Sequence, residues 1–209
     1  MGFYPKNPGL SQVLQSEVDS DTPDRAFIAH CEWSTTEAAT ADADGVHALV
    51  TDNGLGTATV LTTGITNPPC PRNITVTVDD VTGDDADIKA VSPIIVGTNI
   101  LDEAITETIG PFTVNTAGIV SGAKAFKTVT SITLPAHDTP YDVTMTVGFG
   151  DILGLPYERD EIPCIGTFLN SVLEATAATI TASATAIDGN TIDLNSALNG
   201  TKVDAYIVV

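Results

Sequence analysis

The chain has 209 residues, of which 43% are hydrophobic and 17% charged, so it can form one large domain with a buried core and is not compositionally disordered. Its 27 acidic and 8 basic side chains give a formal net charge of −19, and no basic cluster offsets it. This balance argues against binding to nucleic acid or to an anionic membrane surface, because both depend on clustered Lys and Arg. Such acidity is typical of a well-solvated surface, and the sharper alternative is contact with a basic partner.

Cysteine usage and the N-terminus indicate a soluble, unprocessed protein. Cys31, Cys70 and Cys164 are far apart, so we expect free thiols in a protein made in a reducing host cytoplasm rather than a disulfide framework. No run reaches the roughly eighteen apolar residues of a membrane helix. The first residues lack the apolar core of a signal peptide, and Lys6 stands where a myristoylation motif has Ser or Thr.

The N-terminal residues predict an extended arm followed by a first strand. Residues 1–24 are rich in Pro and polar side chains and contain one short apolar patch, Leu10, Val13 and Leu14. This is too little to fold alone, so the segment is either a floppy tail or an arm that orders against a neighbouring subunit, which the apolar patch favours. Residues 25–33 predict the first strand.

The next segment contains a hairpin signal and a rigid link. Asp52-Asn53-Gly54 favours a tight hairpin turn, with a partner strand over 57–63, because Asn and Gly tolerate positive φ. A proline-rich stretch over 68–71 then ends any pairing. We predict an N-terminal arm and first strand over 1–45 and a β-sandwich domain over 46–209.

The central stretch, residues 73–157, predicts an all-β protein. Short runs of Val, Ile and Thr at two-residue spacing are broken about every eight to twelve residues by Gly, Pro, Asn or Asp, which is typical of an antiparallel β-sandwich. A slip in the apolar pattern at Ser131 indicates a bulge, and residues 79–87 indicate an acidic turn. The strands predicted here cover residues 72–78, 88–97, 104–109, 111–116, 125–134 and 143–147.

The C-terminal part predicts further strands. Residues 164–174 are interpreted as one long strand, with a short helix as the alternative, and two short strands follow over 180–183 and 191–194. Asn199-Gly200 predicts a turn that makes residues 203–209 a closing hairpin strand, so the last residues should be paired rather than frayed.

Two motifs could carry catalytic or phosphate chemistry, and neither is convincing. His30 and Cys31 are adjacent, so on a strand they point to opposite faces and cannot form a nucleophile pair. Gly148, Gly150 and Gly154 lack the basic residue and the strand-to-helix transition of a phosphate loop, and we interpret them as serving a tight turn.

Acidic clusters resemble calcium ligands in composition but lack the EF-hand spacing. We interpret them as solvated turns, with a weak cation site over 79–87 as the alternative. The residues concerned are Asp42, Asp44, Gly45, Asp79, Asp80, Asp84, Asp85 and Asp87. We therefore assign no catalytic, cofactor-binding or metal-binding residues, expect no cofactor, and expect that the chain is not an enzyme.

A series of motifs resembles a group of virion structural proteins of tailed bacteriophages that have an immunoglobulin-like sandwich. The resemblance covers roughly Val46–Val209 and depends on the motifs occurring in order. They are Pro71-Arg-Asn-Ile-Thr-Val-Thr-Val, Val96-Gly-Thr-Asn, Ala104-Ile-Thr-Glu-Thr-Ile, the segment from Gly122 to Ala136, Gly154-Leu-Pro-Tyr, and the segment from Asn190 to Val209.

The resemblance implies a component of the virion head or tail and brings no site residues with it. We expect a capsid auxiliary protein of the decoration or cement type, on the head exterior, with the major capsid protein and copies of itself as partners and a homo-oligomer, such as a trimer, as its state. The alternative is a tail tube or other tail component. A third alternative is a carbohydrate-binding or adhesion module, for which Trp33, Tyr141 and Tyr157 are the candidate aromatic residues.

Overall fold

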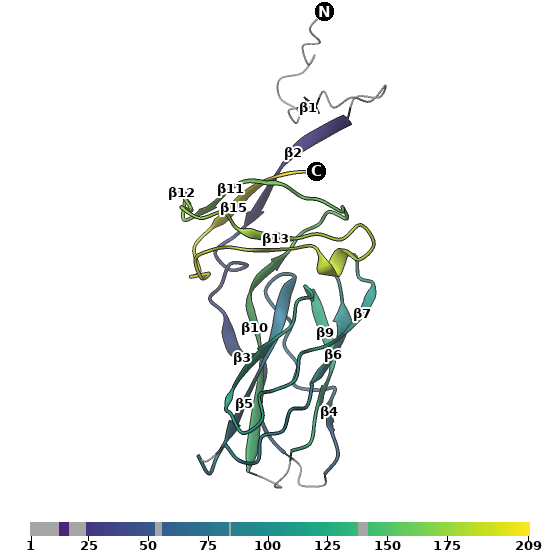
Figure 1. Cartoon of the computed structure of the whole chain (residues 1–209), viewed down its shortest axis with the longest axis vertical. Helices are drawn as coiled ribbons and strands as arrows, with labels where there is room; N and C mark the ends of the chain where they lie inside the picture. Colours follow the sequence, from purple (N-terminus) through teal and green to yellow (C-terminus); the bar gives the residue numbers. More distant parts are fainter. Residues whose placement is uncertain (1–12, 17–23, 53–55, 84, 138–141) are drawn as a thin grey trace, which may run out of the picture.

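The protein is all-β, as predicted, and its strands form antiparallel sheets (Figure 1). The computed structural model describes residues 13–16, 24–52, 56–83, 85–137 and 142–209. The strands are β1 Val13–Ser16, β2 Asp24–Trp33, β3 Asp42–Thr51, β4 Thr59–Leu61, β5 Arg72–Asp80, β6 Ile94–Thr98, β7 Ala104–Thr108, β8 Gly118–Ser121, β9 Thr128–Leu134, β10 Val143–Gly154, β11 Cys164–Leu169, β12 Val172–Leu173, β13 Thr179–Thr181, β14 Thr191–Asp193 and β15 Val203–Val208. A single 3₁₀ turn, Ile187–Gly189, is the helical element among the described residues.

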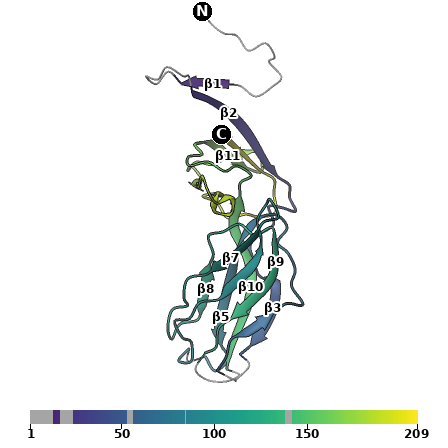
Figure 2. The same cartoon turned by 90° about the vertical axis from the view of Figure 1, so that its right-hand side faces the viewer.

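Two sheets pack face to face around the main core (Figure 2). One has the order β13-β14-β10-β5-β8, with β3 also paired to β10, and the other has the order β4-β9-β6-β7. The alternation in β5 explains the packing, because Ile74, Val76 and Val78 are all buried in this core. Ile132 and Leu134 of β9 enter it from the opposite sheet. The immunoglobulin-like strand order and the division at residue 45 stay predictions.

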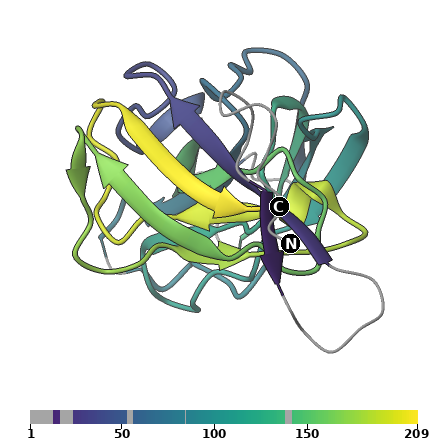
Figure 3. The same cartoon turned by 90° about the horizontal axis from the view of Figure 1, so that it is seen from above.

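A third sheet, which we call the end sheet, closes one end of the sandwich. Its order is β1-β2-β15-β11-β12, so it joins strands from both ends of the chain (Figures 1 and 3). Its inner face packs on a second core that contains Trp33 from β2, Leu153 from β10 and Ile207 from β15. Phe27 and Val209 exchange backbone hydrogen bonds of 2.9 Å, which confirms that the last residues are paired.

The longest strand, β10, connects the two cores. Val143, Met145, Val147 and Phe149 lie in the main core, and Leu153 lies in the second core. The predicted tight turn at the three glycines is therefore wrong, because all three lie inside this strand. These glycines instead let neighbouring groups pack close to the β10 backbone. A Cβ on Gly150 would lie 2.7 Å from the Asn73 amide, and one on Gly154 would lie 2.7 Å from the Ala125 methyl.

Two predicted hairpins are wrong because the chain changes sheets at the turn. β3 pairs with β10 and β4 with β9, so the partner strand predicted over 57–63 belongs to the opposite sheet. Asn53-Gly54 itself lies outside the described residues. Gly200 does adopt a positive φ of 75°, but β15 pairs with β2 and β11 instead of forming a hairpin with β14. A turn motif in the sequence indicates that the chain reverses direction, but it does not determine which sheet the next strand joins.

Other predicted boundaries were corrected by local backbone geometry. Residues 111–116 form no strand, and Asn115 has a φ of 54°. Residues 164–174 form the β11–β12 hairpin, neither a helix nor one strand, because Asn170 and Ser171 both have positive φ in a two-residue turn. The predicted bulge near Ser131 is confirmed, since the β6–β9 register shifts between Val96 and Gly97.

Of the part of the chain that the structure describes, none forms a helix with the length and hydropathy that crossing a bilayer would require.

We predict that Gly148→Ala destabilises the protein by about 3 kcal/mol, because the new methyl would overlap the β3 backbone. The Cβ would lie 2.6 Å from the carbonyl carbon of Ala43. Urea unfolding followed by circular dichroism measures the loss. Gly118→Ala is the matched control, because a Cβ there meets nothing within 4 Å and stability should be nearly unchanged. Equal stability of the two variants would contradict the packing described for β10.

Candidate functional site

The outer face of the end sheet gathers exposed aromatic, apolar and charged side chains. β2 and β15 pair so that His30 lies opposite Tyr206 and Glu32 opposite Asp204. Since side chains alternate along a strand, these four residues share one face, while Cys31 and Ala205 turn into the second core. The exposure of His30 and the burial of Cys31 confirm that this pair cannot act together as a nucleophile and base.

An aromatic row crosses three strands of this face. The rings of His30 and Tyr206 are stacked, with centroids 4.7 Å apart and an angle of 9° between their planes. Phe168 of β11 meets the Tyr206 ring edge-on at 5.9 Å. Leu173 of β12, which is 59% exposed, pairs with Phe168 and continues the row. Its side chain lies over Gly166, where a Cβ would be 3.3 Å from Leu173 Cδ1. The rings support one another across the sheet, and cross-strand aromatic pairs of this kind stabilise it.

A network of charges borders the row. Asp204 Oδ1 lies 2.7 Å from His30 Nε2 and 3.1 Å from Lys202 Nζ, and Lys202 Nζ lies 2.9 Å from Glu32 Oε2. Burial alone would raise the pKa of Asp204, but the hydrogen bonds from His30 and Lys202 outweigh it, so that pKa lies below its usual value. The hydrogen bond to Glu32, and then that to Asp204, raise the pKa of Lys202.

An open hollow of about 330 Å³ lies between the row and the charges. It is lined by His30, Phe168, Ser171, Lys202, Asp204 and Tyr206. Its lining is therefore partly aromatic and partly charged, a combination that favours an amphipathic side chain of a partner over a purely apolar one.

The same residues offer the one metal-ligand grouping found among the described residues. Ligand atoms of His30, Glu32 and Asp204 lie within 4.8 Å of one another. The Lys202 ammonium already lies between the two carboxylates and supplies a positive charge to both. We therefore interpret the group as an ion-pair network on the surface.

The residues considered from sequence lie elsewhere. Trp33 is 6% exposed in the second core and Tyr157 packs against it, so neither is a free loop aromatic, and Tyr141 is outside the described residues. Asp80 caps its own turn by accepting hydrogen bonds from the Thr82 hydroxyl and backbone N–H. Asp84 of the acidic turn is also outside the described residues.

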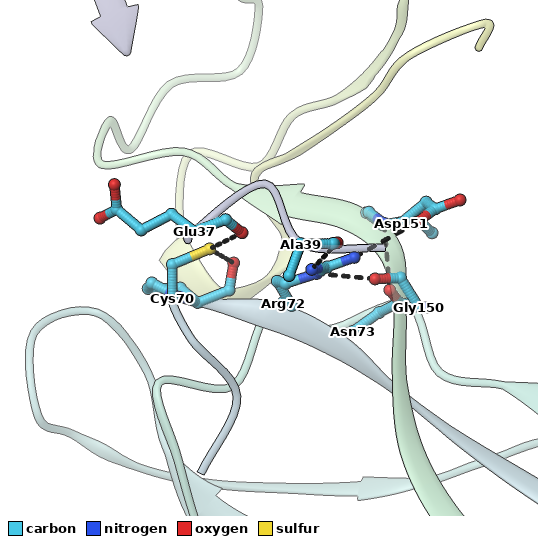
Figure 4. Close-up of polar contacts among 9 residues, drawn as sticks. Glu37, Ala39, Cys70, Arg72, Asn73, Gly150 and Asp151 are labelled. Carbon is cyan, nitrogen blue, oxygen red and sulfur yellow. Dashed lines mark hydrogen bonds and ion pairs between the residues drawn. The ribbon is translucent and has the colours of Figure 1, made fainter. Parts of the chain in front are cut away.

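A buried arginine fixes the junction between the sandwich and the end sheet (Figure 4). Arg72 Nε donates a hydrogen bond of 2.7 Å to the Gly150 carbonyl, and another guanidinium nitrogen donates one of 2.6 Å to the Ala39 carbonyl. A third donates to Asp151 Oδ1 at 3.2 Å, and the guanidinium carbon lies 4.7 Å from the Phe149 ring centroid. Burial lowers the pKa of Arg72, and the neighbouring Cys70 and Asp151 partly offset this effect.

Sequence reasoning missed the residues that make this surface. In β15, Asp204, Tyr206 and Val208 alternate with the buried apolar residues Val203, Ala205 and Ile207, so their shared face could have been read from the sequence. Their pairing with β2 could not, because it joins residues 174 positions apart, as the His30–Asp204 contact does.

Comparisons of the chain with protein-family models, with curated proteins and with solved structures found no match. Its function is therefore argued from its own residues.

We predict that Arg72→Met lowers the free energy of unfolding by about 3–5 kcal/mol, since it leaves the buried Gly150 carbonyl, the half-buried Ala39 carbonyl and Asp151 without their donor. Thermal and urea unfolding measure the loss. Lys127→Met is the matched control: it removes an ion pair with Asp102 that is largely exposed, so it should cost about 1 kcal/mol or less. A similar loss in both variants would contradict the role given to Arg72.

We predict that the Cys70 thiol resists alkylation in the folded protein, because burial raises its pKa to about 12. At a pH between 9.0 and about 12, the Cys70 thiol is ionised in the unfolded chain but keeps its proton in the native state. The free energy of unfolding therefore falls as the pH rises through this range. Iodoacetamide labelling at pH 8.5, followed by mass spectrometry, should modify the less buried Cys164 first. Equal labelling of the two thiols in the native state would contradict the prediction.

Proposed function

We propose that this protein is a capsid auxiliary protein of a tailed bacteriophage, which binds the outside of the head through its end sheet and stabilises the shell. The single observation that supports it best is the gathering of exposed aromatic and apolar side chains on the outer face of the end sheet. This sheet lies at one end of an elongated molecule (Figure 1). Exposed apolar patches mark interaction sites more often than chance.

A ribbon of backbone at the same end also supports docking. β1 pairs with residues 24–27 of β2, and this part of β2 runs beyond the body of the protein (Figures 1 and 2). A two-stranded ribbon is marginal in water without a surface to pack on. A cement protein works by burying such surfaces across neighbouring subunits, and specific interfaces bury about 1,600 Å² in total.

The net charge of −19 fits the rest of the surface. A protein that stands on a shell exposes most of its area to solvent, where a high net charge favours solubility and discourages aggregation. Only the docking end needs to be partly apolar.

The test is whether purified protein binds DNA-filled heads that lack it, measured by co-sedimentation and cryo-electron microscopy. We expect occupancy at regular positions, with the end sheet against the shell. Leu173→Asp should weaken binding by at least tenfold, or about 1.4 kcal/mol, because it places a charge in the apolar row.

Val81→Asp is the matched control, because Val81 is 63% exposed and follows β5 at the end of the sandwich far from the end sheet. Bare heads together with self-assembled tubes of the purified protein would overturn the proposal and move the chain to the tail.

A further inference from the structure

We propose that the outer face of the end sheet binds a partner surface that presents an arginine beside apolar side chains. This inference rests on the proposed function, in that the partner is the shell subunit. It specifies the chemistry that the shell subunit must bring, which the proposed function leaves open.

The outer face of the end sheet carries more negative than positive charge. Glu32 and Asp204 share one ammonium, that of Lys202, so one negative charge is left over whenever His30 is neutral. In water this excess costs little. Under an interface it would become a desolvated charge without a partner, which is strongly destabilising. A partner that covers this face must therefore bring a positive charge.

Another copy of the chain is poorly suited to supply that positive charge. In a two-fold contact through this face, each copy would present the same excess carboxylate to the other. The chain also has few cations to offer. Among the described residues, Arg72 is buried, Lys89 is half-buried, and Lys124 and Lys127 form ion pairs with Asp188 and Asp102. Arg159 is exposed, but it lies beside Phe27 and Val209 and does not line the hollow. A two-fold contact of two copies through this face is therefore unfavourable.

The hollow suits an arginine side chain better than a lysine side chain. The hollow beside Asp204 has aromatic lining from Tyr206 and Phe168, and its volume of about 330 Å³ can hold a large side chain. A guanidinium is planar, stacks on or beside aromatic rings and donates two parallel hydrogen bonds to a carboxylate, whereas an ammonium is a compact and strongly hydrated charge. The Lys202 side chain is 43% exposed, so it can move aside.

The face also meets the apolar half of the requirement. Leu173, Phe168 and the edge of Tyr206 lie on the side of the hollow away from Glu32. Central aromatic and arginine contacts surrounded by apolar side chains are typical of the residues that dominate binding energy.

The chemistry is tested without heads by titrating ¹⁵N-labelled full-length protein with N-acetyl-arginine amide. We expect localised shifts of the amide signals of residues 30–32 and 202–206 at millimolar concentration, smaller shifts with N-acetyl-lysine amide, and loss of the shifts in Glu32→Gln. Absence of localised shifts would overturn the inference.

The docking is tested with DNA-filled heads and two variants of opposite expected effect. Glu32→Gln should weaken binding by about tenfold, because it removes the excess charge that the arginine neutralises. Lys202→Met should strengthen binding several-fold, because it removes the internal cation that competes with the arginine. Val81→Asp should bind like the wild type.

The outcomes separate the two proposals. If the wild type binds heads and both variants bind equally well, this inference is overturned and the proposed function stands. If the wild type does not bind heads at all, the proposed function fails, and the arginine titration alone decides the chemistry of the face. Unchanged thermal unfolding of Glu32→Gln, whose side chain is 52% exposed in the wild type, shows that a weakened contact does not reflect a folding defect.

Discussion

The structure depends on a buried arginine at the junction of its two cores. Arg72 is fully buried, and its guanidinium holds β10 through Gly150 and Asp151 and the segment after β2 through Ala39. Removing a guanidinium from water is expensive, and the cost is offset only when each donor finds an acceptor in good geometry. Since β10 enters both cores, fixing it at this point orients the end sheet on the sandwich.

That orientation produces the surface on which the functional proposals rest. Strands from both ends of the chain meet in the end sheet, with their alternate residues buried in the second core. The remaining residues of β2, β15 and β11 must then share one outer face, and Gly166 leaves room for Leu173 on it. The aromatic row and the network around Lys202 are consequences of this register, and a shift of one residue would turn both inward.

The sequence was sufficient for the fold class and for the strands with clear alternation, such as β2, β5 and β7, because period-two burial is a local property. It was insufficient for pairing, as the separate sheets of β3 and β4 show, because a turn does not determine which sheet the chain enters. It also failed at the glycines of β10, which let neighbouring groups pack against the strand and do not form a turn. The candidate surface combines residues from β2, β11 and β15, so only its individual faces could be anticipated.

The central claim is that the outer face of the end sheet is the docking surface, and lysine acetylation footprinting on head-bound protein tests it most directly. Lys202 and Lys127 are matched, with side chains 43% and 42% exposed, and each pairs with carboxylates. Mass spectrometry would compare their acetylation in free and head-bound protein. The account predicts that binding protects Lys202 and leaves Lys127 unchanged. Protection of Lys127 with Lys202 still reactive would contradict it.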